Sequence, residues 1–111
     1  MLKLPLLFMT SLLLLTSACA QQNDFDTLCS YFDSLESEEG LNKMTSLEKY
    51  TYINTLVSNI DSGSDARVSW ETIINLPANK RYPMFIEVAE DSLKKAWRCE
   101  SMKNQISLLP D

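Results

Sequence analysis

Residues 79–99 read NKRYPMFIEVAEDSLKKAWRC and form the longest and most regular stretch of the chain. Its apolar residues recur every three or four positions, as on one face of an amphipathic helix: Phe85, Val88, Ala89, Leu93, Ala96 and Trp97. Proline is tolerated in the first turn of a helix, so Pro83 predicts a start between Asn79 and Tyr82. The stretch therefore predicts a long helix that runs up to Cys99.

Residues 23–37, NDFDTLCSYFDSLES, show the same helical spacing near the start of the chain. The apolar residues that share one face there are Phe25, Leu28, Cys29, Phe32 and Leu35. Asn23 or Asp24 is placed to cap this helix, because a short polar side chain accepts a hydrogen bond from a free N–H group of the first turn. The pattern puts Cys29 on the buried face.

Two further helices are expected between these segments. Thr45 and Glu48 have the spacing of a capping box, which predicts a helix start. Ser64 or Asp65 is placed to cap a third helix, which Pro77 ends. No stretch of five or more residues shows the strict alternation of a half-buried strand. The sequence predicts an all-α fold of about four short helices in a compact bundle, with one disulfide.

The first residues have the layout of a targeting segment. Lys3 gives a positive start, residues 4–15 are a nearly continuous apolar run, and small residues follow. Such a run is too short for a membrane-spanning helix, which needs about 20 residues, so it predicts a signal peptide over residues 1–20. Residues 21–111 are then expected to form a single small helical domain. We expect it to be exported, either free in the periplasm or membrane-anchored and facing the periplasm.

Two cleavage sites fit the end of the signal. Ala18 and Ala20 occupy the small-residue positions of a cut after Ala20, which would release a soluble protein. Ser17, Ala18 and Cys19 fit a lipoprotein cut before Cys19, whose sulfur would then carry a lipid. Lipoprotein signals usually have leucine three residues before that cysteine, and here the residue is Thr16. Soluble release is favoured and lipidation of Cys19 is the alternative, in which the lipid is the only expected contact with the membrane.

Both processing routes leave Cys29 and Cys99 as the two free thiols of an exported protein. Disulfides persist in oxidising compartments, so we expect these two residues to be bridged. The bridge would close a loop of about 71 residues and contribute at most about 4 kcal/mol to stability. A reactive single thiol and a metal site are the alternatives. The chain has no histidine, so zinc lacks its usual ligands, and we expect no metal and no other cofactor.

Charge and composition argue against several classes of function. With Lys3 removed, nine Lys and Arg residues face fifteen Asp and Glu residues, a net charge near −6 that disfavours binding to nucleic acid. The absence of histidine removes the common nucleophile–base pairs, and two glycines in the whole chain exclude a phosphate-binding glycine loop. Adjacent acids such as Glu38 and Glu39 diverge by about 100° on a helix and do not converge on a substrate. The sequence therefore predicts that the protein is not an enzyme.

The residues expected to form an interface fall into two groups. They are Tyr31, Asp33, Glu36, Glu38 and Glu39 in and after the first helix, and Lys80, Arg81 and Tyr82 near the start of the fourth. An acidic surface with an exposed aromatic residue suits a basic partner protein. The same polarity has a second interpretation, in which the acidic first helix pairs internally with basic residues of the fourth.

These features predict a non-enzymatic periplasmic or envelope module that binds another envelope protein, as an inhibitor, an immunity protein or an accessory protein. The alternative is a lipid-anchored envelope lipoprotein with a structural or assembly role.

The stretch RVSWETIINLPANKRYPMFIEVAEDSLKKAWRCESMK at residues 67–103, with Cys29 and the pair Tyr31-Phe32 upstream, resembles a group of small exported proteins of Gram-negative bacteria. That group shares a signal, an early cysteine, a helix bearing tryptophan and a late helix ending in Trp-x-Cys. The resemblance implies the helical fold and the pairing of Cys29 with Cys99, and it says nothing about catalysis. Periplasmic immunity proteins are similar at the level of class, being small, helical and disulfide-bearing.

We predict that the mature protein begins at Gln21. The Ala18-x-Ala20 pattern and the Thr16 departure from the lipoprotein motif both favour this cut. The intact mass of the exported protein measures it directly. A species that begins at Cys19 and is heavier by a diacylglycerol group would contradict the prediction.

Overall fold

The computed structural model describes residues 22–111. The predicted signal peptide, Cys19 and both cleavage sites lie outside this range. The described part of the chain is helical and contains no strand. Its elements are α2 (Asp24–Ser37), α3 (Glu39–Asn42), α4 (Ser46–Val57), α5 (Asp65–Ile73), α6 (Ala78–Leu93), α7 (Glu100–Gln105) and the 3₁₀ helix η1 (Ile106–Leu108). The predicted all-α fold is confirmed.

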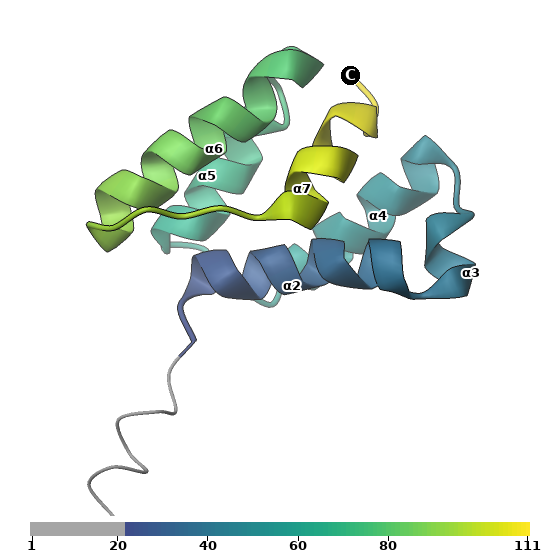
Figure 1. Cartoon of the computed structure of the whole chain (residues 1–111), viewed down its shortest axis with the longest axis horizontal. Coiled ribbons are helices and arrows are strands. Elements are labelled where there is room, and N and C mark those ends of the chain that lie inside the picture. Colours follow the sequence, from purple (N-terminus) through teal and green to yellow (C-terminus); the bar gives the residue numbers. More distant parts are fainter. Residues whose placement is uncertain (1–21) are drawn as a thin grey trace, which may run out of the picture.

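The helices pack around one cluster of buried side chains. α5 and α6 lie side by side, and α2 packs on α4, on α5 and on α7 (Figure 1). η1 packs on α6, so the last residues of the chain fill the space between α2 and α6. The core residues are Phe25, Leu28, Phe32, Leu35, Ile53, Val57, Ile60, Ala66, Trp70, Ile73, Phe85, Ala89, Trp97, Cys99, Met102, Ile106 and Leu109.

Side-chain caps start three of the helices, as the sequence indicates. Asn23, rather than Asp24, caps α2, and its Oδ1 accepts a hydrogen bond from the N–H of Asp26 at 2.8 Å. Ser64 caps α5 in the same way. At α4 both bonds of the capping box between Thr45 and Glu48 are present. The backbone N–H and then the hydroxyl of Thr45 hold the pKa of the Glu48 carboxyl below its ordinary value, because both bonds favour the carboxylate.

The helix predicted over residues 79–99 has different limits in the structure. α6 begins at Ala78 and ends at Leu93. Pro83 is thus the sixth residue of the helix rather than a first-turn residue, and it has no N–H group to donate to the carbonyl of Asn79. Both residues are exposed, so water can reach that carbonyl. The expectation that proline confines the start of the helix to residues 79–82 is therefore wrong by one residue.

α6 ends at Leu93, six residues before Cys99, and the residue that follows it has a left-handed conformation. Lys94 has φ 58°, a conformation that is uncommon outside glycine, and its N–H donates to the carbonyl of Glu90 at 2.9 Å. The chain then runs back in an extended conformation to α7 (Figure 1). Trp97 is buried as predicted, but it lies in this extended segment, and Ala96, predicted to share its face, is exposed.

Hydrogen bonds and ring contacts fix Trp97 between α2 and α6. Its indole N–H donates to Oδ1 of Asp26 at 2.8 Å, and its backbone N–H donates to Oε2 of Glu90 at 3.2 Å. The ring makes an edge contact with Phe25 and a tilted one with Phe85, with centroids 6.2 and 5.5 Å away. These contacts hold the extended segment on the core. They explain why the helical periodicity correctly predicted that Trp97 is buried but wrongly placed it in a helix.

Three short helices, α3, α7 and the 3₁₀ helix η1, have no counterpart in the sequence prediction. Gly40 lies inside α3. Residues 100–108 form α7 and η1, and Met102, Ile106 and Leu109 from the end of the chain are buried in the core. Helices of one or two turns show too few repeats of the 3.6-residue period to be recognised.

The predicted disulfide is confirmed. Cys29 of α2 and Cys99 are bonded, with their Cα atoms 5.8 Å apart. Because α6 ends early, the bond joins α2 to the residue that caps α7, and not to the end of the fourth long helix. It spans 70 residues of sequence and ties the first helix to the last.

Arg81 is fully buried, which corrects its placement in a surface group. Its guanidinium donates to the carbonyls of Leu76, Ile106, Leu109 and Pro110, at 2.9 to 3.1 Å. A buried cation is tolerated only when its donors are satisfied. Arg81 therefore attaches the C-terminal residues to the beginning of α6 and is not available to a partner.

None of the helices in residues 22–111 combines the length and the apolar character that crossing a membrane requires.

We predict that the double replacement C29S/C99S lowers the free energy of unfolding by about 2–5 kcal/mol, because the unfolded chain loses a long-range constraint. Urea unfolding of the oxidised mature protein and of the variant measures the difference. Two thiols that react in the native exported protein, or equal stabilities, would contradict it.

We predict that R81M lowers the free energy of unfolding by about 3–5 kcal/mol, because several carbonyls lose their donor in the interior. K80M is the matched control, since Lys80 is the exposed neighbour on the same helix. The control should change stability by about 0.5 kcal/mol or less. Similar effects of the two replacements would show that the Arg81 contacts contribute little.

Candidate functional site

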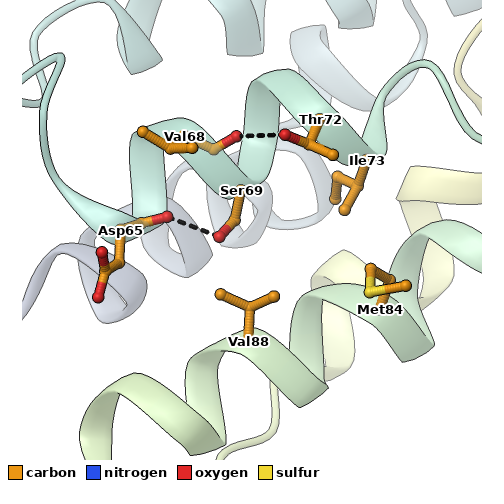
Figure 2. Close-up of a pocket in the computed structure, with 7 residues that line it drawn as sticks. All are labelled: Asp65, Val68, Ser69, Thr72, Ile73, Met84 and Val88. Atoms are coloured by element: carbon orange, nitrogen blue, oxygen red, sulfur yellow. Dashed lines mark hydrogen bonds between the residues drawn. The ribbon is translucent and has the colours of Figure 1, made fainter.

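A groove runs between α5 and α6 on the outer side of this helix pair (Figure 2). Its volume is about 280 Å³. The lining residues are Asp65, Val68, Ser69, Thr72 and Ile73 from α5, and Met84 and Val88 from α6. Ser69 and Ile73 point from α5 toward α6, and Val88 points back toward α5 (Figure 2). The groove is the seam between two packed helices.

The helical periodicity of α5 and α6 produces this lining. α5 buries Ala66 and Trp70 in the core, which leaves positions 65, 68 and 72 on the outer shoulder of the helix. α6 buries Phe85 and Ala89, so positions 84 and 88 lie one turn apart on its matching shoulder. The walls therefore rest on side chains that the core holds in place.

The surface inside the groove is mainly apolar. Val68 is 50% exposed and Met84 is 41% exposed, and both are large hydrophobic side chains. The hydroxyls of Ser69 and Thr72 donate to backbone carbonyls of their own helix, at 2.6 and 2.9 Å (Figure 2). Asp65 accepts a hydrogen bond from the hydroxyl of Ser92 at 2.7 Å. The groove thus presents apolar surface with one carboxylate at its end.

Two other hollows lie near the last residues of the chain. One, of about 600 Å³, is lined by Asn75, Leu76, Pro77, Ala78, Asn79 and Asp111. The other, of about 250 Å³, is lined by Leu47, Tyr50, Ile74, Asn75, Pro110 and Asp111. The larger is bordered mostly by the connection between α5 and α6, and the smaller has one exposed large hydrophobic residue, Leu47. The α5/α6 groove has two such residues and two helical walls, so it is the better candidate site.

The acids of α2 that were predicted to form an interface are exposed, but two of them contact α7. Oδ1 of Asp33 accepts from the hydroxyl of Ser101 at 2.6 Å. Oε2 of Glu36 accepts from the side-chain amides of Asn104 and Gln105, at 3.2 and 3.1 Å. These bonds connect the first helix to the last through neutral donors. Asp33 and Glu36 therefore have a structural role that the sequence did not reveal.

The other members of this predicted group differ in their surroundings. Tyr31 is half-buried and packs against the core. Glu38 precedes α3, and Glu39 pairs with Lys43 at 3.5 Å in a strongly exposed ion pair. Glu38 and Glu39 thus lie on the surface just after α2, some distance along the chain from the groove residues.

The alternative interpretation, an internal pairing of acidic α2 with basic α6, is not what the structure has. The ion pairs found within residues 22–111 connect Lys43 to Glu39, Arg67 to Glu71, Arg81 to Asp111, Lys94 to Asp91 and Arg98 to Glu90. None of them joins α2 to α6. Asp33 and Glu36 of α2 form hydrogen bonds with neutral side chains of α7 instead.

The second predicted group is divided by the fold. Lys80 is exposed, whereas Arg81 is buried among carbonyls. The Tyr82 hydroxyl accepts a hydrogen bond from the N–H of Cys99 at 2.9 Å, so this half-buried ring supports the segment that follows α6. Only Lys80 of the three presents a free polar group to solvent.

One cluster in the described chain has the residue types of a metal site: Cys29, Asp33 and Cys99, whose potential ligand atoms lie within 4.8 Å of one another. The two sulfurs are bonded to each other. Metals bind cysteine as the thiolate, a form that the disulfide does not provide. The arrangement is the surroundings of a structural disulfide.

No protein-family model, no curated protein and no solved structure matches this chain. The site is therefore interpreted from its own geometry and chemistry.

Proposed function

We propose that this chain is an exported, non-enzymatic module that binds another protein of the periplasm or cell envelope, and that the α5/α6 groove is its binding surface. The observation that carries the proposal is the pair Val68 and Met84, two large apolar side chains left exposed in one groove. Apolar surface gathered in one place favours burial against a partner, and methionine is enriched in protein interfaces.

The rigidity of the groove supports this role. Trp70 of α5 and Phe85 of α6 are buried directly beneath its walls. The Cys29–Cys99 disulfide and the contacts of Arg81 hold the helices that complete the core. A preorganised surface loses little conformational freedom when a partner binds, so more of the contact energy appears as affinity.

The apolar N-terminal run and the disulfide favour an exported location, because disulfides persist outside the cytoplasm. An inhibitor, an immunity protein or an accessory protein would each act in the proposed way. If Cys19 is lipidated, the same groove would face the periplasm from a membrane-tethered protein with an assembly role.

We predict that the mature protein captures a partner from periplasmic extract and that V68S/M84S loses this capture. The variant L47S/L108S is the matched control, because it also removes two exposed hydrophobic side chains, 64% and 58% exposed, away from the groove. Each protein is immobilised, the bound proteins are quantified by mass spectrometry, and thermal unfolding verifies the fold. Loss with V68S/M84S alone, at unchanged stability, is the expected result.

Equal capture by both variants would contradict the assignment of the groove. A third variant, E36Q/E38Q/E39Q, tests the acidic residues of α2, which stay a sequence-based prediction of an interface. It should retain capture if the groove is the site. Turnover of an envelope substrate that is lost on a single carboxylate-to-amide replacement would overturn the non-enzymatic proposal as a whole.

A further inference from the structure

Acidic residues surround the α5/α6 groove. Asp65 lines it, and Glu71 follows Val68 by three positions on α5. On α6, Glu87 and Asp91 follow Met84 and Val88 by three positions each. Residues three apart on a helix are neighbours on its surface, so these exposed carboxylates border the apolar lining.

Cations near the groove neutralise these acids only in part. Glu71 pairs with Arg67 at 3.5 Å, and Asp91 pairs with Lys94 at 3.7 Å. The second pair is strongly exposed on both sides and holds its partners weakly. Within residues 22–111, Glu87 has no ion pair. Lys95 is exposed and lies four positions after Asp91, and at the other end Lys80 lies one turn before Met84. At the end near Asp65 and Val88, three acids (Asp65, Glu87 and Asp91) face two lysines (Lys94 and Lys95), so negative charge exceeds positive charge there by one.

The groove has the shape that receives a third helix. It follows the seam of two packed helices, and α5, with nine residues, gives it a length of about 13 Å, or two to three helical turns. A helix laid along such a seam inserts apolar side chains at positions i, i+3 or i+4, and i+7. Its remaining faces would meet the acidic border on both sides.

We infer that the occupant of the groove is a basic amphipathic helix of the partner protein, an inference that rests on the proposed function. Its apolar side chains contact Val68 and Met84, and its lysine or arginine residues face the carboxylates near Asp65 and Asp91. The negative charge at the border of the groove favours a basic helix over the other possible occupants. A second copy of this chain, with net charge −5, or an anionic membrane would bring like charges together at this border.

Two synthetic peptides test the inference on the full mature protein. Both are about four turns long, with leucine at i, i+3, i+4 and i+7. One has lysine at its polar positions and the other has glutamate. Fluorescence anisotropy gives the dissociation constants at low salt and at about 0.15 M salt. The lysine peptide should bind about tenfold or more tightly than its glutamate twin, and salt should weaken its binding.

Matched variants separate the local border from the overall charge. E87Q/D91N should weaken binding of the lysine peptide about three- to tenfold and reduce its salt dependence. E38Q/E39Q removes the same number of charges at the end of α2 and should leave binding unchanged. V68S/M84S should abolish binding. All of these residues are exposed, and the melting temperature of each variant verifies its fold.

Three results would overturn the inference: equal binding of the two peptides, equal weakening by E38Q/E39Q, or a concentration-dependent dimer that V68S/M84S abolishes. Suppose that capture of a periplasmic partner requires Val68 and Met84, but the two peptides bind equally or E38Q/E39Q weakens binding as much as E87Q/D91N. The proposed function would then stand, and only the basic helix would be refuted. Failure of both the capture and the lysine peptide would refute both.

Discussion

The buried guanidinium of Arg81 is the interaction on which the arrangement of the helices depends. It reaches one carbonyl at the end of the α5 region, one in η1 and two in the residues that follow, all within 3.1 Å. An apolar side chain in its place would leave the buried bonds to the carbonyls of Ile106 and Leu109 unmade, which is costly in the interior. Arg81 thereby converts the last residues of the chain from a loose tail into part of the core, where Met102, Ile106 and Leu109 cover α2 and α6. The C-terminal residues are also attached to α2, by hydrogen bonds between α2 and α7 and by the neighbouring disulfide.

Much of this fold could be predicted from the sequence, because the four long helices repeat their apolar face several times and three of them begin at a recognisable cap. The disulfide could be predicted because Cys29 and Cys99 are the two thiols left after the expected signal peptide is removed, and the expected compartment is oxidising. The end of α6 could not be predicted: the apolar stripe continues through Ala96 and Trp97, and nothing local marks Lys94 as left-handed. The turn is imposed from outside the segment, by Trp97 bonding to Asp26 and by Cys99 bonding to Cys29. Tertiary contacts of this kind override helix propensity.

The candidate site was also only partly predictable. Sequence reasoning assigned Asp33, Glu36, Arg81 and Tyr82 to an interface. In the structure Arg81 is buried, and the other three each form a hydrogen bond to another part of the fold. Charged side chains look alike in a sequence whether they face solvent or backbone carbonyls. The groove itself depends on which shoulder of α5 meets which shoulder of α6, and helical periodicity within a single segment does not specify that pairing. The one sign of the groove in the sequence is that Val68 and Met84 lie outside the apolar faces of their helices.

The position of the two cysteines has a consequence for how such a chain reaches its final state. Cys29 lies early in the described chain and Cys99 lies twelve residues from the end of the sequence. An exported chain that crosses the membrane from its N-terminus has its first thiol outside for almost the whole of translocation before the second one arrives. The contacts of Arg81 wait for residues 106–110 in the same way. The core therefore needs residues from both ends of the described chain, and under the proposed export it could close only after residues 99–110 had crossed the membrane.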